Sequence, residues 1–325
     1  MNILMLSVGR RVELLKDFRL SMSKESRIVA ADLSPYAPAL YLADKQYLVP
    51  RIDDPSYIDT ILEICKKESI NAVTTLIDPE IEILAQNREK FESLGVEVLA
   101  PYKETAKLCF NKYLMFKHLV ANGIPTVMTW GTLEEFQTSY SKGEVAFPVF
   151  VKPRTGSGSV GARKIDSMVL LTEAMQTDPS LIIQEFMNCT DMDADVYIDT
   201  ISHKAVAAFS KKKIETRIGG ASKTVSFKDA ELFDFIQRIC ELLKFNGPAD
   251  MDFFYKDGKY YLSEVNPRFG GAYLHAYGAG IDFIKLIENN LNGNENIPSF
   301  GDYDESVVMM MYDSVVICRA NEIVQ

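Results

Sequence analysis

Two carboxylates and one amide beside an Asp-Gly turn are the side chains best placed to bind a metal ion. Apolar and polar residues alternate over Asp250–Arg268 on both sides of the turn, which predicts a β-hairpin. With the turn centred near Gly258, Asp252 lies opposite Glu264, and Asn266 follows on the same face. Such oxygen ligands suit Mg²⁺, with Mn²⁺ as the alternative, because the ion completes its shell with phosphate and water. We expect these three residues to carry the metal.

The same register pairs Phe254 with Leu262 and Lys256 with Tyr260. The alternative interpretation is a solvent-facing acidic edge strand, and the apolar residues between the acids argue against it. Two facing carboxylates repel each other unless positive charge lies between them. Arg268 follows the hairpin at once, and a guanidinium beside a metal suits a bidentate phosphate contact.

The run Gly156–Gly161 has the spacing GxGxxG, which several kinds of loop share. A dinucleotide loop opens a helix, whereas Ala162–Ile165 looks extended. A kinase loop precedes its lysine, whereas Lys152 comes first here and no HRD or DFG follows. No P-loop Gly-Lys-Ser/Thr is present. What remains is a flexible turn, or a strand bearing Lys152 and a phosphate-cradling loop of Gly156, Ser157, Gly158 and Ser159.

Two further groups of cations could face phosphates. Lys112 lies on the helix predicted before this strand, and it is either a phosphate ligand or an ordinary surface lysine. Lys211–Lys213 with Arg217 form a small basic cluster, which is either a solvated loop or a flap over phosphates.

Two predicted strand ends near the N-terminus could face a substrate. The run Ser7–Arg11, of which Gly9 and Arg10 are the expected substrate contacts, lies where the first strand meets the first helix, a place that favours anions. Asp78 and Glu80 follow another strand, at the edge where open α/β sheets bind ligands. The alternative for each pair is an ordinary loop that caps a helix. Asp32 would suit a ribose in a dinucleotide site, but Gly9 stands alone where three glycines are expected.

Composition narrows the class of protein. The chain has 325 residues, 47% hydrophobic and 25% charged, which suits two or three packed subdomains. A net charge of −10 argues against nucleic-acid binding. No apolar run approaches the roughly 20 residues of a membrane span. Five scattered cysteines without a CxxC, and an N-terminus that reads as a buried strand rather than a signal peptide, predict a reduced, cytoplasmic protein without structural zinc.

Strand and helix patterns alternate over the first hundred residues, which predicts a parallel sheet with helices on both faces. Beyond the helix Asn111–Asn122 the pattern becomes α+β in two lobes. The apolar stretch Val307–Met311 is either a core strand or an interface, and we expect a core strand. The predicted elements are strands at 3–8, 27–31, 72–77, 96–100, 147–152, 181–187, 195–200 and 205–211, and helices at 12–18, 57–67, 81–91, 230–245 and 281–291.

Taken in order, these motifs resemble the ATP-grasp superfamily, and most of all its single-unit proteins similar to the carbamoyl phosphate synthase large subunit. The segments that carry the resemblance run from about residue 110 to 295: Asn111-Lys112, Phe147–Pro153, Thr155–Gly161, Ile183–Met187, Asp250–Asp252 and Glu264–Arg268. The resemblance implies a Rossmann-like pre-ATP-grasp domain over 1–110 and a two-lobed ATP-grasp domain over 111–300. A small lid lobe spans about 125–185, and a C-terminal strand segment covers 301–325.

The resemblance also implies roles for individual residues. Lys112 and Lys152 hold ATP phosphates under the Gly/Ser loop. Glu185, Phe186 and Met187 form the hinge beside adenine, and Leu262 packs on the base. Asp191 stands where the family usually has a ribose-binding glutamate, and its shorter side chain weakens that assignment. Asp252, Glu264 and Asn266 carry magnesium, and Arg268 meets the γ-phosphate and the acyl phosphate; Arg268 and Lys152 are the expected catalytic residues.

The expected activity is Mg-ATP-dependent ligation. A small-molecule carboxylate becomes an acyl phosphate, and an amine or similar nucleophile attacks it. A possible homodimer is also expected. One alternative is an ATP-grasp phosphotransferase with a stable phosphorylated product, since only the acceptor differs. An NAD(P)-dependent oxidoreductase and a non-catalytic ATP sensor are the others. One unit and no evident cysteine–histidine glutaminase argue against carbamoyl phosphate synthesis.

Overall fold

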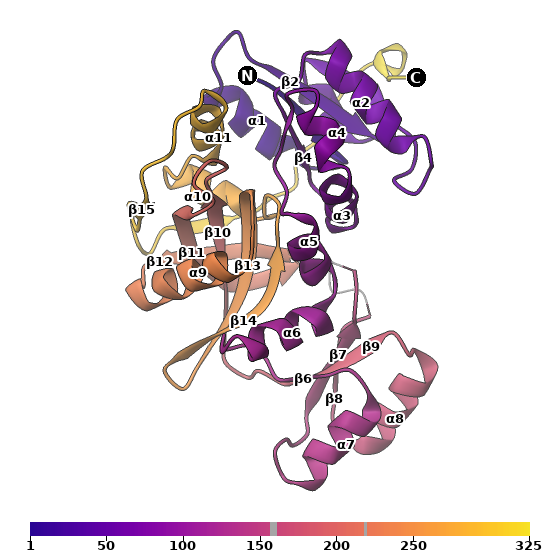
Figure 1. The fold of residues 1–325 in the computed structure, drawn as a ribbon, viewed down its shortest axis with the longest axis vertical. Coiled ribbons are helices and arrows are strands. Elements are labelled where there is room, and N and C mark those ends of the chain that lie inside the picture. The colour runs from indigo at the N-terminus through magenta and orange to yellow at the C-terminus, as the bar shows by residue number, and fades with distance from the viewer. Residues whose placement is uncertain (157–160, 218–219) are drawn as a thin grey trace.

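The computed structural model describes residues 1–156, 161–217 and 220–325. In this part of the chain, three sheets form three bodies, stacked along the long axis in Figure 1. The N-terminal body is at the top, the largest sheet is in the middle, and a small lobe is at the bottom. Ser157, Gly158 and Ser159 of the expected phosphate loop lie outside the described residues.

The N-terminal body is a five-stranded parallel sheet in the order β3-β2-β1-β4-β5. Its strands are largely buried, because helices cover both faces of a parallel sheet. The sheet confirms the predicted α/β start, and the carboxyl ends of β1 and β4 meet at one edge. The elements are β1 (Asn2–Leu6), α1 (Val12–Ser21), β2 (Arg27–Asp32), η1 (Pro38–Leu42), β3 (Lys45–Leu48), α2 (Tyr57–Lys67), β4 (Ala72–Thr75), α3 (Asp78–Gln86), α4 (Arg88–Glu92) and β5 (Glu97–Val98).

The small lobe is a four-stranded sheet with a core of its own around Phe136, Val149 and Leu171. Two helices pack on it, and the lobe extends away from the rest of the molecule (Figure 1). The small lobe is therefore packed around a hydrophobic core separate from those of the other two bodies. The connecting helices are α5 (Lys103–Phe110) and α6 (Lys112–Ala121), and the lobe consists of β6 (Thr129–Trp130), α7 (Leu133–Ser141), β7 (Val149–Pro153), β8 (Arg163–Ile165), α8 (Met168–Thr177) and β9 (Leu181–Glu185).

The largest sheet has seven strands, with β14-β13-β10-β11-β12-β16 as its main path and β15 beside β11. Helices from two later segments pack against it and bury Phe235, Ile239 and Phe283. The elements are β10 (Thr190–Ile198), β11 (Ala205–Arg217), β12 (Gly220–Phe227), α9 (Ala230–Leu242), β13 (Gly247–Lys256), β14 (Lys259–Asn266), α10 (Tyr273–Gly278), α11 (Phe283–Leu291), β15 (Ser299–Phe300), β16 (Val308–Met310) and η2 (Ala320–Glu322).

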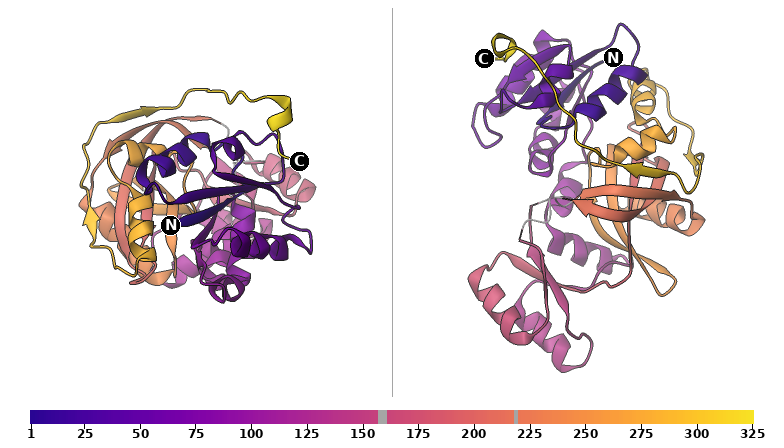
Figure 2. Two further views of the ribbon diagram at one scale, coloured as in Figure 1. Left: turned by 90° about the horizontal axis from the view of Figure 1, so that it is seen from above. Right: turned by 180° about the vertical axis from the view of Figure 1, so that it is seen from behind.

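The last strand corrects one expectation. Val308 and Met310 on β16 are 47% and 65% exposed, so the predicted core strand at 307–311 is wrong. The strand pairs only with β12 at the edge of the sheet, and no layer covers it within the described residues. From there the chain runs back across the molecule to the N-terminal body (Figure 2). No helix in the described ranges is long and apolar enough to cross a membrane.

The β13–β14 hairpin has an irregular register. Asp257 and Gly258 both have positive φ, which is the two-residue type I′ turn, and it pairs Lys256 with Lys259. The predicted pairs Lys256–Tyr260 and Phe254–Leu262 are therefore wrong by one residue. A bulge between Leu262 and Glu264 corrects the shift, so that Asp252 does lie opposite Glu264 as predicted.

Candidate active site

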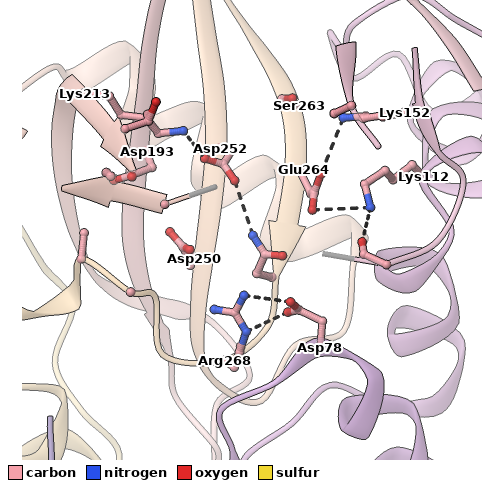
Figure 3. Close-up of a pocket in the computed structure, with 18 of the residues that line it drawn as sticks. Asp78, Lys112, Lys152, Asp193, Lys213, Asp250, Asp252, Ser263, Glu264 and Arg268 are labelled. Carbon is pink, nitrogen blue, oxygen red and sulfur yellow. Dashed lines mark hydrogen bonds and ion pairs between the residues drawn. The ribbon is translucent and has the colours of Figure 1, made fainter. Parts of the chain in front are cut away.

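A cavity of about 690 Å³ lies where the three bodies meet. Residues from all three line it, so its shape depends on how the bodies are arranged (Figure 3). A concave pocket that is lined by many charged side chains at a boundary between bodies is a common place for a substrate site. The lining residues used below are Arg11 and Asp78 from the N-terminal body, Lys152 and Gly156 from the small lobe, Lys112 from α6, and Asp191, Asp193, Lys213, Asp250, Asp252, Glu264, Asn266 and Arg268 from the large sheet and its exit.

The expected metal ligands lie together on one face of the hairpin. Asp252 is paired with Glu264 across β13 and β14, and Asn266 Nδ2 donates to Asp252 Oδ2 over 3.4 Å. All three line the cavity. No cluster of three or more His, Cys, Asp or Glu ligands occurs among the described residues. Two carboxylates and an amide fit Mg²⁺, which takes its remaining ligands from phosphate and water.

Two lysines from different elements converge on Glu264. The Nζ atoms of Lys112 and Lys152 each lie 3.6 Å from one of its carboxylate oxygens (Figure 3). Lys112 also donates to the carbonyl of Gly156 over 2.6 Å, which ties α6 to the start of the glycine loop. Burial, followed by the charge of Lys112, lowers the pKa of Lys152, although Glu264 raises it. An anion with several oxygens is the natural ligand of two such cations.

One lysine of the basic cluster, Lys213, lines the cavity. Lys211 and Lys213 lie on β11 and Lys211 is fully buried, so the solvated-loop interpretation is wrong for these two residues, whereas Lys212 and Arg217 are exposed. Lys211 Nζ lies 2.6 Å from Asp193 and 2.5 Å from Asp195. Although burial lowers the pKa of Lys211, these acids raise it above its usual value.

Lys213 has a second pair of acids. Its Nζ lies 2.5 Å from Asp252 and 3.0 Å from Asp191. Although burial lowers its pKa, Asp252 and neighbouring acids raise it, so the amine is charged. A ligand that binds at Asp252 must therefore compete with or share this ammonium.

The inner end of the cavity joins the large sheet to the N-terminal body. Arg268 Nε lies 2.8 Å from Asp78 Oδ1, and Nη2 donates to Asp78 Oδ2 over 2.9 Å. Although burial lowers the pKa of Arg268, Asp78 raises it. Of the four residues predicted at the substrate end, Asp78 is the one that lines the cavity.

Arg11 lies where the sequence pointed to Arg10. The Arg10 side chain is 80% exposed and pairs with Asp313, because it precedes α1 on the outer side. Arg11 instead lines the cavity and donates through Nη2 to the carbonyls of Phe269 and Gly270. Burial, helped by Arg268, lowers its pKa to about 10, so it stays charged at neutral pH. The expectation for Arg10 is corrected: the predicted anion-binding run Ser7–Arg11 included Arg11, but Arg10 was the basic residue assigned to the substrate.

Gly9 and Glu80 lie near this end but outside the cavity lining. Gly9 N donates to Asp32 over 2.8 Å, which occupies the carboxylate that a dinucleotide site would need. Glu80 is fully buried and accepts hydrogen bonds from Ser7, Tyr57 and Thr75. Burial raises its pKa to about 8. Both residues hold the edge of the sheet together.

Of the residues expected to contact the adenosine part of ATP, only some line the cavity. Asp191 lines the cavity, whereas Glu185, Phe186, Met187 and Leu262 are not among the lining residues. Leu262 is buried in the core, and its backbone pairs with the segment around Thr126. Glu185 accepts from Met128 N over 3.1 Å at the base of the small lobe. Their contacts with the base stay predictions.

Comparison with known proteins gives two matches to domain families. Residues 3–99 match the family described as "PylC-like, N-terminal domain". Residues 81–272, more than half of the chain, match the family described as "ATP-grasp domain". The second match includes the small lobe, the glycine loop, the hairpin and Arg268.

Individual relatives are distant. A pyruvate carboxylase subunit of Methanothermobacter thermautotrophicus is 21% identical over 78% of this chain and 58% of its own length. "D-alanine--D-alanine ligase B" of Clostridium perfringens is 27% identical over 58% of this chain and 70% of its own. The solved N5-carboxyaminoimidazole synthetase of Staphylococcus aureus, complexed with ADP, has a TM-score of 0.77 at 17% identity. That match covers 95% of this chain and 81% of the solved one, and it shows a shared fold.

Proposed function

Because the chain belongs to the ATP-grasp family, we propose that it is a Mg-ATP-dependent ligase that activates a carboxylate as an acyl phosphate and passes the acyl group to an amine or similar nucleophile. The observation that carries the proposal is that Lys112 and Lys152 converge on Glu264, which lies opposite Asp252, while Arg268 lines the same cavity on its ion pair with Asp78. These groups supply the charges that a transferring phosphoryl group needs. The relatives named above include ligases and an ADP complex, which supports the same class of reaction.

The roles of the chain's own residues follow from their positions. Lys112 and Lys152 would hold the phosphates of ATP, and Asp252, Glu264 and Asn266 would hold Mg²⁺, which supplies charge neutralisation between them. Arg268 would orient the transferred phosphoryl group while Asp78 fixes its guanidinium. The substrate carboxylate oxygen attacks the γ-phosphorus, and the bond to the ADP oxygen breaks. The amine then attacks the acyl carbon and phosphate leaves.

The small lobe would serve as a lid. Lys152 and Gly156 belong to it and reach the same cavity as the large sheet. Closure over bound nucleotide would exclude water, which otherwise hydrolyses an acyl phosphate. Residues of the lobe at Glu185–Met187 would then meet the adenine.

A screen of carboxylates and amines for ADP release tests the proposal. Ligation requires that ADP release depend on both substrates and that an amide form. A phosphotransferase would instead give a stable phosphorylated product from one acceptor. No ADP release with any pair, or binding of NADH in place of ATP, would contradict the proposal. The homodimer and the cytoplasmic location stay predictions of the sequence.

A further inference from the structure

One acid in the cavity stands apart from the others. Each of the other acids that line it has an ion pair: Asp78 with Arg268, Asp191 and Asp252 with Lys213, Asp193 with Lys211, and Glu264 with two lysines. Asp250 also lines the cavity, yet among the described residues no cation lies within ion-pair distance of it and no side chain is hydrogen-bonded to it. Figure 3 shows its carboxylate between Asp252 and Arg268 without a partner.

The position of Asp250 is fixed by strand register. It lies opposite Asp195 on β10 and Asn266 on β14. Along β13 it is two residues from Asp252, which is paired with Glu264. The backbone closes behind it, because a Cβ on Gly270 would lie 2.8 Å from Asp250 Cγ. The carboxylate therefore cannot turn back into the protein, and the cavity is its open side. Burial, followed by the charges of Asp252, Asp193 and Asp195, raises the pKa of Asp250, so its carboxyl favours the neutral form on its own and the charged form beside a bound cation.

A matching cation with free donors lies on the same wall. Arg11 uses Nη2 for the carbonyls of Phe269 and Gly270, and Gly270 belongs to the turn that packs behind Asp250. In the described part of the chain, no partner occupies its Nε or Nη1. Arg11 and Asp250 do not pair directly, and both line the cavity. One carboxyl group and one guanidinium thus face the same space, with Asp250 nearer the metal ligands.

We infer that the amine acceptor is an amino acid, whose ammonium group is bound by Asp250 and whose carboxylate is bound by Arg11. The inference rests on the proposed function and names the substrate class of that site. The positions of Asp250 and Arg11 along the cavity determine the orientation of the bound amino acid. The amine lies beside the row of Asp252 and Glu264, where the acyl phosphate forms, and the carboxylate lies toward the N-terminal body. A molecule with only one of the two charges leaves the other protein group unpaired, which is the strongest basis for discrimination.

The test measures binding, so that it does not need the second substrate. The protein is first titrated with MgADP, and failure to bind would remove the proposed function and this inference together. The MgADP complex is then titrated with single amino acids, with matched acids that lack the amine, such as propionate for alanine, and with amines that lack the carboxylate, such as ethylamine. We expect at least one amino acid to bind saturably and both analogues to bind about 10- to 100-fold more weakly.

The variants assign each charge to its residue. Asp250→Asn should weaken amino-acid binding about 10- to 100-fold and abolish the preference over the acid without an amine. Arg11→Met should abolish the preference over the amine without a carboxylate. Asp234→Asn, an exposed acid on α9, is the matched control and should change neither. If MgADP binds and no amino acid does, or if Asp250→Asn weakens the amino acid and its des-amino analogue equally, the inference is wrong.

Discussion

Arg268 and Asp78 form a two-contact ion pair, with Nε–Oδ1 at 2.8 Å and Nη2–Oδ2 at 2.9 Å, across the boundary between the large sheet and the N-terminal body. Both side chains are 13% exposed. The pair fixes the planar guanidinium that would meet the transferred phosphoryl group. The N-terminal body thereby contributes to the site without any glycine-rich dinucleotide loop.

The substitution Asp78→Asn should separate positioning from nucleotide binding. We expect turnover to fall about 10- to 100-fold while the apparent affinity for MgATP changes little, because Arg268 loses its orientation rather than its charge. Removing one partner of a buried pair should also lower the free energy of unfolding by about 3 kcal/mol. ADP release and thermal unfolding measure the two effects.

Glu82→Gln on the same helix is the control, and Asp78→Glu should recover part of the rate. Equal losses in the affinity for MgATP and in turnover would argue against positioning.

The substitutions Lys112→Met and Lys152→Met should each weaken MgATP binding by about 10- to 100-fold. The loss should be larger for Lys152, because both lysines approach Glu264 but only Lys152 lies on the small lobe that we propose closes over the nucleotide. Calorimetric titration gives the affinities. Lys117→Met, at an exposed position on α6, is the matched control. Unchanged affinity in both variants would mean that the phosphates bind elsewhere.

Asp199 should contribute to stability above an acid threshold. Its Oδ2 accepts from Asn290 and from the backbone and side chain of Asn296, and Oδ1 accepts from Ile201 and Ser202. Burial raises the pKa of Asp199, but these hydrogen bonds outweigh it and lower the pKa to about 2. A lowered folded-state pKa gives stability that is complete above the unfolded value, near 4, and is lost as the pH falls toward 2.

The variant Asp199→Asn tests that assignment. At pH 7 it should be less stable than the wild type by about 2 kcal/mol, because it loses charge-assisted hydrogen bonds. The difference should shrink as the pH falls from about 4 to 2, as chemical denaturation at each pH would show. Asp234→Asn should show no such convergence. A difference that is constant with pH would contradict the role of the charge.

Much of the fold could be predicted because the longer elements carry clear apolar periodicity. The helix predicted at 57–67 is α2 to the residue, and the parallel start and the hairpin are also present. Short elements with little buried surface gave no signal. β3 has one exposed and three half-buried residues, and it was missed for that reason. β16 was predicted as a core strand although it is an exposed edge strand, because an apolar strand at a sheet edge has the same sequence pattern as a core strand.

The site was predictable where chemistry depends on residue type and was not where it depends on register or packing. Asp252 and Glu264 were paired correctly although the turn was placed wrongly, because the bulge at Ser263 offsets a two-residue turn. The ion pairs of Lys211 depend on which strands are neighbours, and no local pattern shows that. The absence of an ion pair at Asp250 could not be predicted, because it depends on which cations pair with the neighbouring acids in the folded protein.

Calorimetric titration with ATP shows whether the protein has a Mg-dependent ATP site built on Glu264. The wild type is titrated with and without Mg²⁺, beside Glu264→Ala and with NADH as the control ligand. We expect saturable ATP binding that requires Mg²⁺ and is at least about 10-fold weaker in the variant, and we expect no binding of NADH. ATP binding that is independent of both Mg²⁺ and Glu264, or binding of NADH alone, would contradict this expectation.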